Sequence, residues 1–335
     1  MKTAVIGCGN ISRCHFAALE KIKEVELSAV VDIKKDRADK AAEKYGCKAY
    51  TDYIEMLETE KPDCVHICTP HYLHSGMAAE ALKRGINVLS EKPCAINENG
   101  LEEIKEALSK STAQYGVCFQ NRYNESVILA KKLLERSEYG KIVCARASVH
   151  WQREADYYSD DWHGRKDKEG GGALLTQAIH TFDLLRYLLD EDFKYVWGHA
   201  LNEKFPLIEV EDTISVRIET ENNVIAVFNA TVGAGMDYPV MVDIVCENAS
   251  IRIEGNSIYL VRDGDFERLF FDGNVDFEGK KYWGKGHESL IDDFYDCIKT
   301  GRPFPIDFFE GEKAIREILA VYHSSETGKR AEVIY

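Results

Sequence analysis

Two glycines directly after a short β-branched run could hold the phosphates of a nucleotide. The segment Gly7-Cys-Gly-Asn-Ile-Ser12 follows the apolar run Thr3–Ile6 and precedes a helical pattern. Gly7 would allow a tight turn, and Gly9 would let the backbone approach a pyrophosphate, which the amino end of the helix then stabilises. The sequence therefore predicts a dinucleotide site whose first contacts are Gly7, Gly9, Asn10 and Ile11.

A carboxylate at the end of the next predicted strand would select the kind of nucleotide. Asp32 closes the strand Glu26–Asp32, at about the distance from the glycines that a Gly-x-Gly-x-x-Gly fingerprint requires. Its oxygens could accept the adenosine ribose hydroxyls and would repel a 2′-phosphate, which favours NAD over NADP as the cofactor. Ser12 replaces the third glycine, where a small residue is needed. In the alternative interpretation, the glycines only form a turn and Asp32 only ends a strand.

These residues need a parallel sheet that brings strand ends together, and the first 120 residues have the pattern for one. Short β-branched runs alternate with helical patterns, as in a doubly wound α/β domain covered on both faces. The predicted strands are Thr3–Ile6, Glu26–Asp32, Cys64–Cys68, Ile86–Ser90 and Gly116–Gln120. The predicted helices are Asn10–Lys21, Asp36–Tyr45, His71–Arg84 and Asn97–Lys110.

The second half of the chain predicts a different, mostly antiparallel sheet. After a helix at Glu125–Arg136, longer strands alternate apolar and polar residues, with a helix at Thr176–Leu189 on one side. The predicted strands are Ile142–Trp151, Tyr195–Leu201, Asp212–Glu219, Val224–Thr231, Val240–Cys246, Ser250–Ile253, Ile258–Val261 and Arg268–Phe271. Two helical patterns, Glu288–Thr300 and Glu310–His323, end the chain.

The length of the chain agrees with two domains. Its 335 residues exceed the size at which a single core stops growing, about 250–300 residues. We expect an NAD-binding Rossmann domain over residues 1–121 and a substrate-binding and oligomerisation α/β domain over residues 122–335. The C-terminal helices are expected to pack back on the first domain.

Charge and cysteine usage restrict the partners and the compartment. A net charge of −15 argues against nucleic acid as a partner. No run approaches the ~18 apolar residues of a membrane helix, and the first residues lack the apolar core of a signal peptide. The 10 cysteines are scattered and form no Cys-x-x-Cys pair, which suits a reducing cytoplasm.

Several motifs together resemble the Gfo/Idh/MocA oxidoreductases, which include glucose-fructose oxidoreductase and inositol dehydrogenase. They are Gly7–Ser12, Ile67-Cys-Thr-Pro70 with His74, Glu91-Lys-Pro93, Gly170-Gly-Gly172 and His180-x-x-Asp183, in order and spacing over most of the chain. The resemblance implies a Rossmann domain followed by an α/β domain with an open antiparallel sheet. It also implies oxidation of a sugar or cyclitol hydroxyl with NAD(P), and a homodimer or homotetramer.

By this resemblance, Lys92 is the catalytic lysine beside the nicotinamide, and Glu91 belongs to the same cofactor site. A cationic ring and partial desolvation would lower the lysine pKa, so Lys92 could take the proton of a hydroxyl. As an ammonium group, Lys92 would instead hydrogen-bond the hydroxyl or the developing carbonyl. In the alternative interpretation, it is a surface lysine after a strand.

His180 is the second candidate for proton transfer. Thr176 and His180 are four residues apart, so a helix places both on one face. Many relatives have an aspartate partner of the histidine at the position of Thr176, and a threonine cannot act as a base. This departure favours His180 as the base and Lys92 as a hydrogen-bond donor. Asp183 is assigned to structure or to orienting His180, and the alternative for His180 is a core histidine.

Further cofactor contacts are expected from the resemblance. Thr69 and Pro70 would pass close to the ribose and pyrophosphate, and His74 would shape the nicotinamide side of the site. Gln120, at a strand end, completes this set. The stretch from His66 to His74 also has zinc-ligand spacing, but no second cluster completes a tetrahedral site, so we predict no metal.

The substrate side is expected to hold a carbohydrate. Aromatic faces pack on the C–H face of a sugar, and polar side chains bind its hydroxyls. The candidate substrate residues are Arg122, Trp162, Arg165, Thr176, His180 and Tyr282, where Arg122 could equally support the structure. Trp162-His-Gly164 is similar to the Trp-Arg-Gly segment of the family, and ordinary core aromatics are the alternative.

These residues predict an NAD-dependent dehydrogenase that oxidises a secondary hydroxyl of a sugar, sugar derivative or cyclitol. One alternative is a redox-assisted glycosidase or lyase that retains and recycles its NAD. Another is an NAD-binding sensor without turnover, against which Lys92 and His180 argue.

Overall fold

The computed structural model describes residues 1–271, 273 and 286–335. The chain divides into two compact units. Unit 1 consists of Met1–Cys118 and His287–Glu312, and unit 2 of Phe119–Gly286 and Lys313–Tyr335. Unit 1 therefore contains a helical segment that follows most of unit 2 in sequence.

Unit 1 is built on a six-stranded parallel sheet in the order β3-β2-β1-β4-β5-β6. The strands are β1 (Lys2–Ile6), β2 (Glu26–Val31), β3 (Lys48–Tyr50), β4 (Cys64–Ile67), β5 (Asn87–Ser90) and β6 (Tyr115–Val117). Successive strands are added in one direction from β1 to β3 and in the opposite direction from β4 to β6, so the strand order reverses between β1 and β4. Ligands of doubly wound sheets bind at this point, beyond the carboxyl ends of the strands. This confirms the predicted Rossmann-type sheet.

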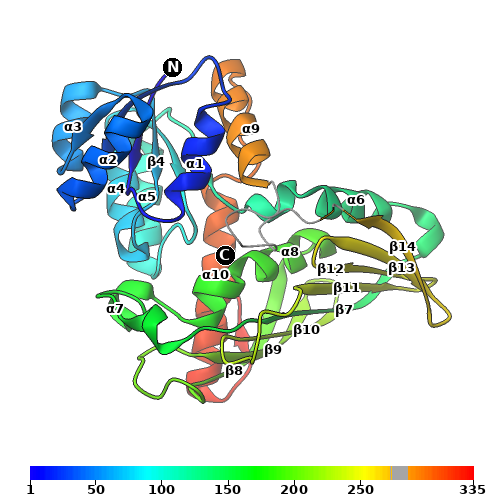
Figure 1. Cartoon of the computed structure of the whole chain (residues 1–335). Coiled ribbons are helices and arrows are strands. Elements are labelled where there is room, and N and C mark those ends of the chain that lie inside the picture. The colour runs from blue at the N-terminus through cyan, green and yellow to red at the C-terminus, as the bar shows by residue number, and fades with distance from the viewer. Residues whose placement is uncertain (272, 274–285) are drawn as a thin grey trace. The chain divides into compact units, whose positions relative to one another are not determined.

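Apolar faces explain why the helices of unit 1 pack where they do (Figure 1). The helices are α1 (Ser12–Leu19), α2 (Lys35–Tyr45), α3 (Tyr53–Glu60), α4 (His74–Lys83), α5 (Glu98–Ser109) and α9 (Gly286–Thr300). Phe16, Leu57 and Leu82 are buried on three of them, and β1 and β4 are almost entirely buried. Asp52 and Asn97 cap α3 and α5 by accepting backbone N–H groups, which sets where these helices begin.

Unit 2 is built on a nine-stranded sheet in the order β14-β13-β12-β11-β7-β10-β9-β8-β15. The strands are β7 (Ile142–His150), β8 (Phe193–Leu201), β9 (Thr213–Thr220), β10 (Ile225–Thr231), β11 (Met241–Cys246), β12 (Ser250–Glu254), β13 (Ser257–Arg262), β14 (Asp265–Phe271) and β15 (Ala331–Glu332). Among the described residues, β7 and β10 are the one parallel pair of this sheet, so it is mostly antiparallel, as predicted. Alternate residues of β9 and β10 are buried, which leaves one face of these strands outside the core.

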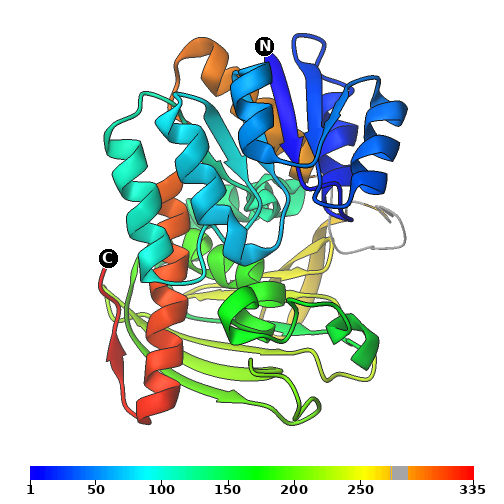
Figure 2. The same cartoon turned by 90° about the vertical axis from the view of Figure 1, so that its left-hand side faces the viewer.

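Helices cover the buried face of the unit 2 sheet. Figure 1 shows α6 (Glu125–Leu134) and α8 (Ile179–Leu189) on the same side of the strands. Phe182 on α8 packs against Phe193 and Phe228, which come from the sheet. Helix α10 (Phe308–Thr327) starts in unit 1 and continues in unit 2, where Figure 2 shows the C-terminal strand returning beside it.

The structure differs from the sequence prediction in several elements. Among them, strand β3, helices α3 and α7 (Lys166–Glu169) and strand β15 were not predicted, and β3, α7 and β15 are too short to show a period. The predicted helix at Thr176–Leu189 begins earlier, as a π-helical segment at Ala173–Ala178 that leads into α8. A π segment has the same apolar pattern as an α-helix over one turn, so the sequence does not separate them.

Two general expectations can be compared with the described residues. Within them, no helix combines the length and the apolar character that a bilayer span requires. All ten cysteines are free thiols, and Cys64, Cys94 and Cys118 are buried in unit 1.

Candidate active site

The glycine turn after β1 has the shape of a phosphate cradle. Gly7 has a φ of +97°, and a Cβ there would lie 2.5 Å from the carbonyl oxygen of Cys68, so only glycine fits. A Cβ at Gly9 would meet no protein atom within 4 Å, so this turn is open where the backbone must approach a ligand. Ser12 is buried and donates its hydroxyl to the carbonyl oxygen of Gly9 at 2.7 Å, which explains how serine replaces the third glycine. Asn10 and Ile11 continue the turn, and Asn10 is exposed.

Asp32 is fixed beside this turn by two backbone groups. Its Oδ2 accepts the N–H of Cys8 at 3.0 Å, and its Oδ1 accepts the N–H of Lys34 at 2.8 Å. Each carboxylate oxygen keeps a lone pair for another donor, such as a ribose hydroxyl. The open cradle at Gly9 and the fixed carboxylate of Asp32 together fit a dinucleotide.

His74 connects the two loops that follow β4 and β5. Its Nε2 lies 2.7 Å from the carbonyl oxygen of Thr69, and its Nδ1 lies 2.7 Å from that of Pro93. Burial lowers the pKa of His74, while hydrogen bonds to both carbonyl oxygens oppose this shift. His74 therefore holds the Thr69–Pro70 turn next to the Lys92–Pro93 turn, and Thr69, Pro70 and Lys92 are partly exposed there.

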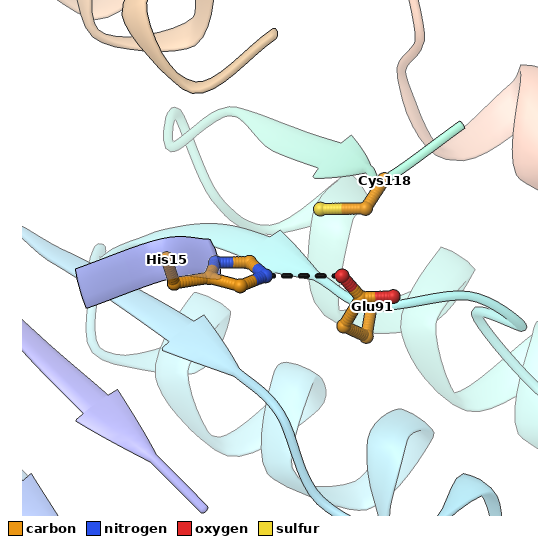
Figure 3. Close-up of side chains that lie close together, drawn as sticks. All are labelled: His15, Glu91 and Cys118. Atoms are coloured by element: carbon orange, nitrogen blue, oxygen red, sulfur yellow. Dashed lines mark hydrogen bonds and ion pairs between the residues drawn. The ribbon is translucent and has the colours of Figure 1, made fainter. Parts of the chain in front are cut away.

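Glu91, directly before Lys92, is buried in a network of hydrogen bonds. Its Oε1 lies 3.0 Å from Nε2 of His15 and 3.3 Å from Nε2 of His287. Burial disfavours the charged form, but the two histidines outweigh it and hold the pKa of Glu91 well below its usual value. An ionised carboxylate can only accept, so both histidines donate to it. Figure 3 shows Glu91 pointing toward His15 from the end of β5.

The hydrogen bonds continue from His15 through His66 to Tyr295. Burial lowers the pKa of His15 and of His66, so both rings are neutral, with one donor nitrogen each. Because Nε2 of His15 donates, its Nδ1 accepts from Nδ1 of His66 at 2.7 Å. Nε2 of His66 then accepts from the Tyr295 hydroxyl at 2.8 Å, and Tyr295 lies 2.6 Å from Thr3 Oγ1. This chain joins β1, β4, α1, the end of β5 and α9, and so fixes the backbone on which Lys92 lies.

His15, Glu91 and Cys118 also contain ligand atoms of the kinds that bind metals, within 4.8 Å of one another (Figure 3). Burial and the nearby Glu91 carboxylate raise the pKa of the Cys118 thiol well above its usual value, whereas metals bind the thiolate. The direct contact between His15 and Glu91 is a hydrogen bond. His66 and His74, which have zinc-ligand spacing in the sequence, point to the other partners given above.

In unit 2, His180 lies at the start of α8 and is partly exposed. Its Nε2 is 3.4 Å from Nε2 of Gln120, and its ring packs edge-on against Phe119. An amide nitrogen can only donate, so in this contact Gln120 is the donor and Nε2 of His180 the acceptor. The structure therefore brings Gln120 to His180, although sequence reasoning assigned it to the cofactor.

Thr176 is buried, and its hydroxyl group is hydrogen-bonded to the carboxyl group of Glu169. Its Oγ1 lies 2.8 Å from Oε1 of Glu169 and 3.0 Å from the carbonyl oxygen of Gly171. The other carboxyl oxygen of Glu169 accepts the N–H of Gly164. Burial raises the pKa of Glu169 to about 7, against the effect of these two hydrogen bonds, and Glu211 and Asp160 raise it further.

Glu211 explains the run of three glycines. Its carboxyl oxygens accept the N–H groups of Gly172 at 2.9 Å and Leu174 at 2.8 Å. A Cβ at Gly172 would lie 1.9 Å from the carbonyl oxygen of Glu211, and one at Gly171 would lie 2.0 Å from the Tyr322 hydroxyl. The glycines thus allow Glu211 and Tyr322 to approach the backbone just before the π segment, and Glu211 holds that segment in place.

Arg122 forms a buried ion pair rather than an exposed cationic contact. Its Nε and Nη2 donate to Asp183 Oδ2 at 2.8 Å and Oδ1 at 2.5 Å. Both side chains are at most 7% exposed, and the guanidinium also lies over the ring of Tyr187. The ion pair gives Arg122 a structural contact, because it ties η2 (Gln120–Tyr123) to α8 through Asp183.

Two further predicted substrate residues, Trp162 and Arg165, lie in the loop after β7. Trp162 is half-buried, its ring lies 3.7 Å from that of His163, and His163 bonds to Asp160. Arg165 is exposed and lies 3.6 Å from Asp167. Tyr282 lies outside the described residues.

Two family models match this chain. The model described as "Oxidoreductase family, NAD-binding Rossmann fold" matches residues 1–119, and the "GFO/IDH/MocA C-terminal domain" matches residues 127–252. The chain belongs to the Gfo/Idh/MocA family. It is therefore an NAD-binding oxidoreductase, as the sequence motifs predicted.

Named members of the Gfo/Idh/MocA family are similar over much or all of the chain. Glucose-6-phosphate 3-dehydrogenase of Bacillus subtilis is 29% identical over 57% of this chain, and the match spans 55% of that enzyme. Inositol 2-dehydrogenase of Rubrobacter xylanophilus is 25% identical over 78% of this chain and 73% of its own length. The WlbA dehydrogenase of Chromobacterium violaceum, solved with NADH and UDP-GlcNAcA, is 29% identical with a TM-score of 0.87, covering 100% of this chain and 96% of that one.

Sequence reasoning missed the buried acids of this Gfo/Idh/MocA member. Glu169 and Glu211 were not among the candidates, nor was the chain of hydrogen bonds from Glu91 through His15 and His66. Glu169 directly precedes Gly170, and an acid before three glycines is the one local signal that points to a special environment. Glu211 has no local signal, because its partners lie 37 and 39 residues away.

Proposed function

We propose that this protein oxidises a secondary hydroxyl of a sugar, sugar derivative or cyclitol with NAD. The observation that supports this most is the similarity over both domains to dehydrogenases of glucose 6-phosphate and inositol and to one solved with a UDP-sugar acid. Lys92 and His180, the two groups able to move a proton, are both present and partly exposed. A binding protein without turnover would not need this pair.

The cofactor half of the reaction is assigned to unit 1. Gly7, Gly9, Asn10 and Ile11 would hold the pyrophosphate, and Asp32 the adenosine ribose, which favours NAD over NADP. Thr69, Pro70 and the Lys92 turn, held together by His74, would bind the nicotinamide end. When bound, the nicotinamide supplies the acceptor for a hydride.

The proton of the hydroxyl is assigned to two residues. His180 would accept it at Nε2 once the substrate hydroxyl takes the place of the Gln120 amide, which lies 3.4 Å from that nitrogen. Lys92, as an ammonium group, would donate a hydrogen bond to the oxygen as it becomes a carbonyl oxygen. Trp162, Arg165 and Tyr282 are the proposed contacts of the sugar. Arg122 instead connects η2 to α8 through its ion pair with Asp183.

The test is the appearance of reduced nicotinamide, measured by absorbance, when the protein is incubated with NAD and a panel of polyols. The panel contains free hexoses, glucose 6-phosphate, inositols, glycosides and a UDP-linked sugar acid. Lys92→Met and His180→Gln serve as the catalytic variants, and Lys35→Met removes an exposed lysine as the control. A rise that both catalytic variants abolish and Lys35→Met preserves is the expected result.

No rise with any compound, although NAD binds, would contradict this function. The same mixtures would then be checked for cleaved glycosides, because a glycosidase or lyase that recycles its NAD produces no net NADH. Cleaved glycoside without net NADH would show that the protein is this redox-assisted enzyme and not a dehydrogenase. Binding of NAD with neither product would indicate a sensor.

We also propose a homodimer or homotetramer that works in a reducing cytoplasm. Val227 and Phe266, on strands β10 and β14, are half exposed, and all ten cysteines are free. Sedimentation equilibrium of the purified protein in a reducing buffer should give two or four copies. A monomer would contradict the assembly and leave the proposed reaction standing.

A further inference from the structure

The hydrogen bonds around Thr176 are best satisfied when Glu169 holds a proton. Thr176 Oγ1 has two acceptors within reach, Glu169 Oε1 at 2.8 Å and the Gly171 carbonyl oxygen at 3.0 Å. A hydroxyl has one proton, so with an ionised Glu169 it cannot serve both acceptors fully. If Oε1 of Glu169 is protonated, it donates to Thr176, and Thr176 donates to Gly171. The three groups therefore have two hydrogen-bond arrangements, one with Glu169 ionised and one with Glu169 protonated.

The surroundings of Glu169 favour exchange between these two states. Residue Glu169 is buried at 1% exposure, and its second oxygen accepts the Gly164 N–H. Desolvation opposes the charge, whereas the Gly164 and Thr176 donors favour it. The titratable and charged groups that act on it or on its neighbours are Glu211, Asp160, Tyr157, Tyr158, Tyr322 and Arg153.

Glu169 is linked to the helical segment of His180 through Thr176. Thr176 precedes His180 by four residues in the continuous segment formed by η5 (Ala173–Ala178) and α8. Residues at this spacing in a helical segment lie about one turn apart. A negative charge in a buried environment stabilises a nearby imidazolium, because the low local dielectric weakens screening.

We propose that Glu169 is a positioning residue for His180. It holds the Thr176 hydroxyl on the turn that leads to His180 and, by ionising, makes His180 a stronger proton acceptor. This inference rests on the proposed function, in which His180 takes the proton of the substrate hydroxyl. The Thr176 position needs no acid of its own, because a carboxyl seven residues earlier supplies one.

The decisive experiment compares the pH profiles of kcat for the wild type and Glu169→Gln. Glutamine resembles the protonated carboxyl in shape and charge, so the two proteins should differ little at low pH. At high pH only the wild type has the negative charge at residue 169. Its kcat should then exceed that of Glu169→Gln by roughly tenfold, which corresponds to a rise of about one unit in the pKa of His180. KM should change little. Glu209→Gln, which removes an exposed carboxylate from the loop before β9, should follow the wild type at every pH.

A ratio of wild-type to Glu169→Gln kcat that is the same at all pH values would show a merely structural role and overturn the inference. If Glu169→Gln does not fold, Thr176→Val and Thr176→Ser replace it. The valine variant removes a donor that stabilises the Glu169 carboxylate, so the pH-dependent rise of kcat should move to higher pH, and the serine variant, which keeps the hydroxyl, should leave it in place. Equal profiles for these two variants would also overturn the inference.

A second measurement does not depend on activity. Infrared difference spectra of the protein between pH 5 and 9 should contain the carbonyl band of a protonated carboxyl that disappears on titration near neutral pH. The band should be absent in Glu169→Gln and present in Glu209→Gln. A band that Glu169→Gln leaves unchanged would contradict the assigned proton. A protein that oxidises no polyol at any pH would contradict the proposed function instead, and parallel pH profiles in an active protein would contradict only the role of Glu169.

Discussion

The two units hold their functional residues by different means. In unit 1, Asp32 bonds to the N–H groups of Cys8 and Lys34, both next to strand ends that the parallel sheet brings together. In unit 2, the segment before His180 is held by Glu169 and Glu211, and Glu211 bonds to Gly172 across 39 residues. The cofactor half therefore follows from a strand-turn-helix rule, whereas the other half depends on buried acids whose partners only the fold reveals.

The largest expected effect is the loss of a proton-handling group from either unit. Lys92→Met and His180→Gln should each lower kcat by about 10²–10⁴-fold, the usual contribution of a positioned acid or base. Steady-state kinetics with the active polyol would measure this. If only one of the two variants is impaired, the reaction depends on a single unit and the division of labour is wrong.

The next-largest effect concerns the buried ion pair between Arg122 and Asp183 in unit 2. Asp183→Asn leaves the buried guanidinium of Arg122 without its anionic partner, which should lower the free energy of unfolding by about 3–5 kcal/mol. Denaturant titration monitored by circular dichroism would measure this loss. Asp190→Asn, which removes an exposed carboxylate paired with Lys131, should cost less than about 1 kcal/mol. An equal loss of unfolding free energy in the two variants would show that burial does not determine how much these ion pairs contribute to stability.

The pH dependence of stability tests the buried acid of unit 2. The pKa of Glu169 is raised to about 7 in the folded protein, so its protonated form is the one that folding favours. Its contribution is complete below the pKa of the unfolded chain and is lost as the pH rises toward about 7. The wild type should therefore lose roughly 3 kcal/mol relative to Glu169→Gln between pH 4 and 8. A constant difference in unfolding free energy over this range would contradict the raised pKa.

A smaller effect is expected at Asp32 in unit 1. Asp32→Asn keeps the shape of the side chain but loses charged acceptors for the ribose hydroxyls, so the Kd for NAD should rise by about 10–100-fold, or roughly 1.5–3 kcal/mol. Calorimetric titration with NAD and with NADP would measure this. The preference for NAD over NADP should fall in the variant, because the charge that repels a 2′-phosphate is gone. An unchanged preference would mean that another residue selects the cofactor.

Much of the fold could be predicted because its signals are local. The alternation of short apolar runs with helical patterns predicted the parallel sheet, and Gly7, Gly9 and Asp32 predicted a cofactor turn, all from residues close together in sequence. The antiparallel sheet was predicted from alternating apolar and polar residues, and alternate residues of β9 and β10 are buried. Short edge strands like β3 and β15 carry too few residues to show that alternation.

The sequence named candidate site residues but not the buried groups that support them. Lys92 and His180 follow from motifs, yet Glu169 and the buried chain from Glu91 through His15 and His66 depend on desolvation, which no spacing rule shows. Arg122 was ambiguous for the same reason, because an arginine at a strand end looks alike in sequence whether it faces a ligand or a buried aspartate.

The most direct test of the proposed reaction follows the hydrogen itself. Glucose 6-phosphate, inositol and a UDP-linked sugar acid, each deuterated at its ring carbons, would be incubated with the protein and NAD, and the reduced nicotinamide analysed by mass spectrometry. Transfer of deuterium from at least one of these compounds to the nicotinamide, abolished by Lys92→Met and by His180→Gln, is the predicted result. Reduced nicotinamide without deuterium, or no reduced nicotinamide from a protein that binds NAD, would contradict hydride transfer from a polyol carbon.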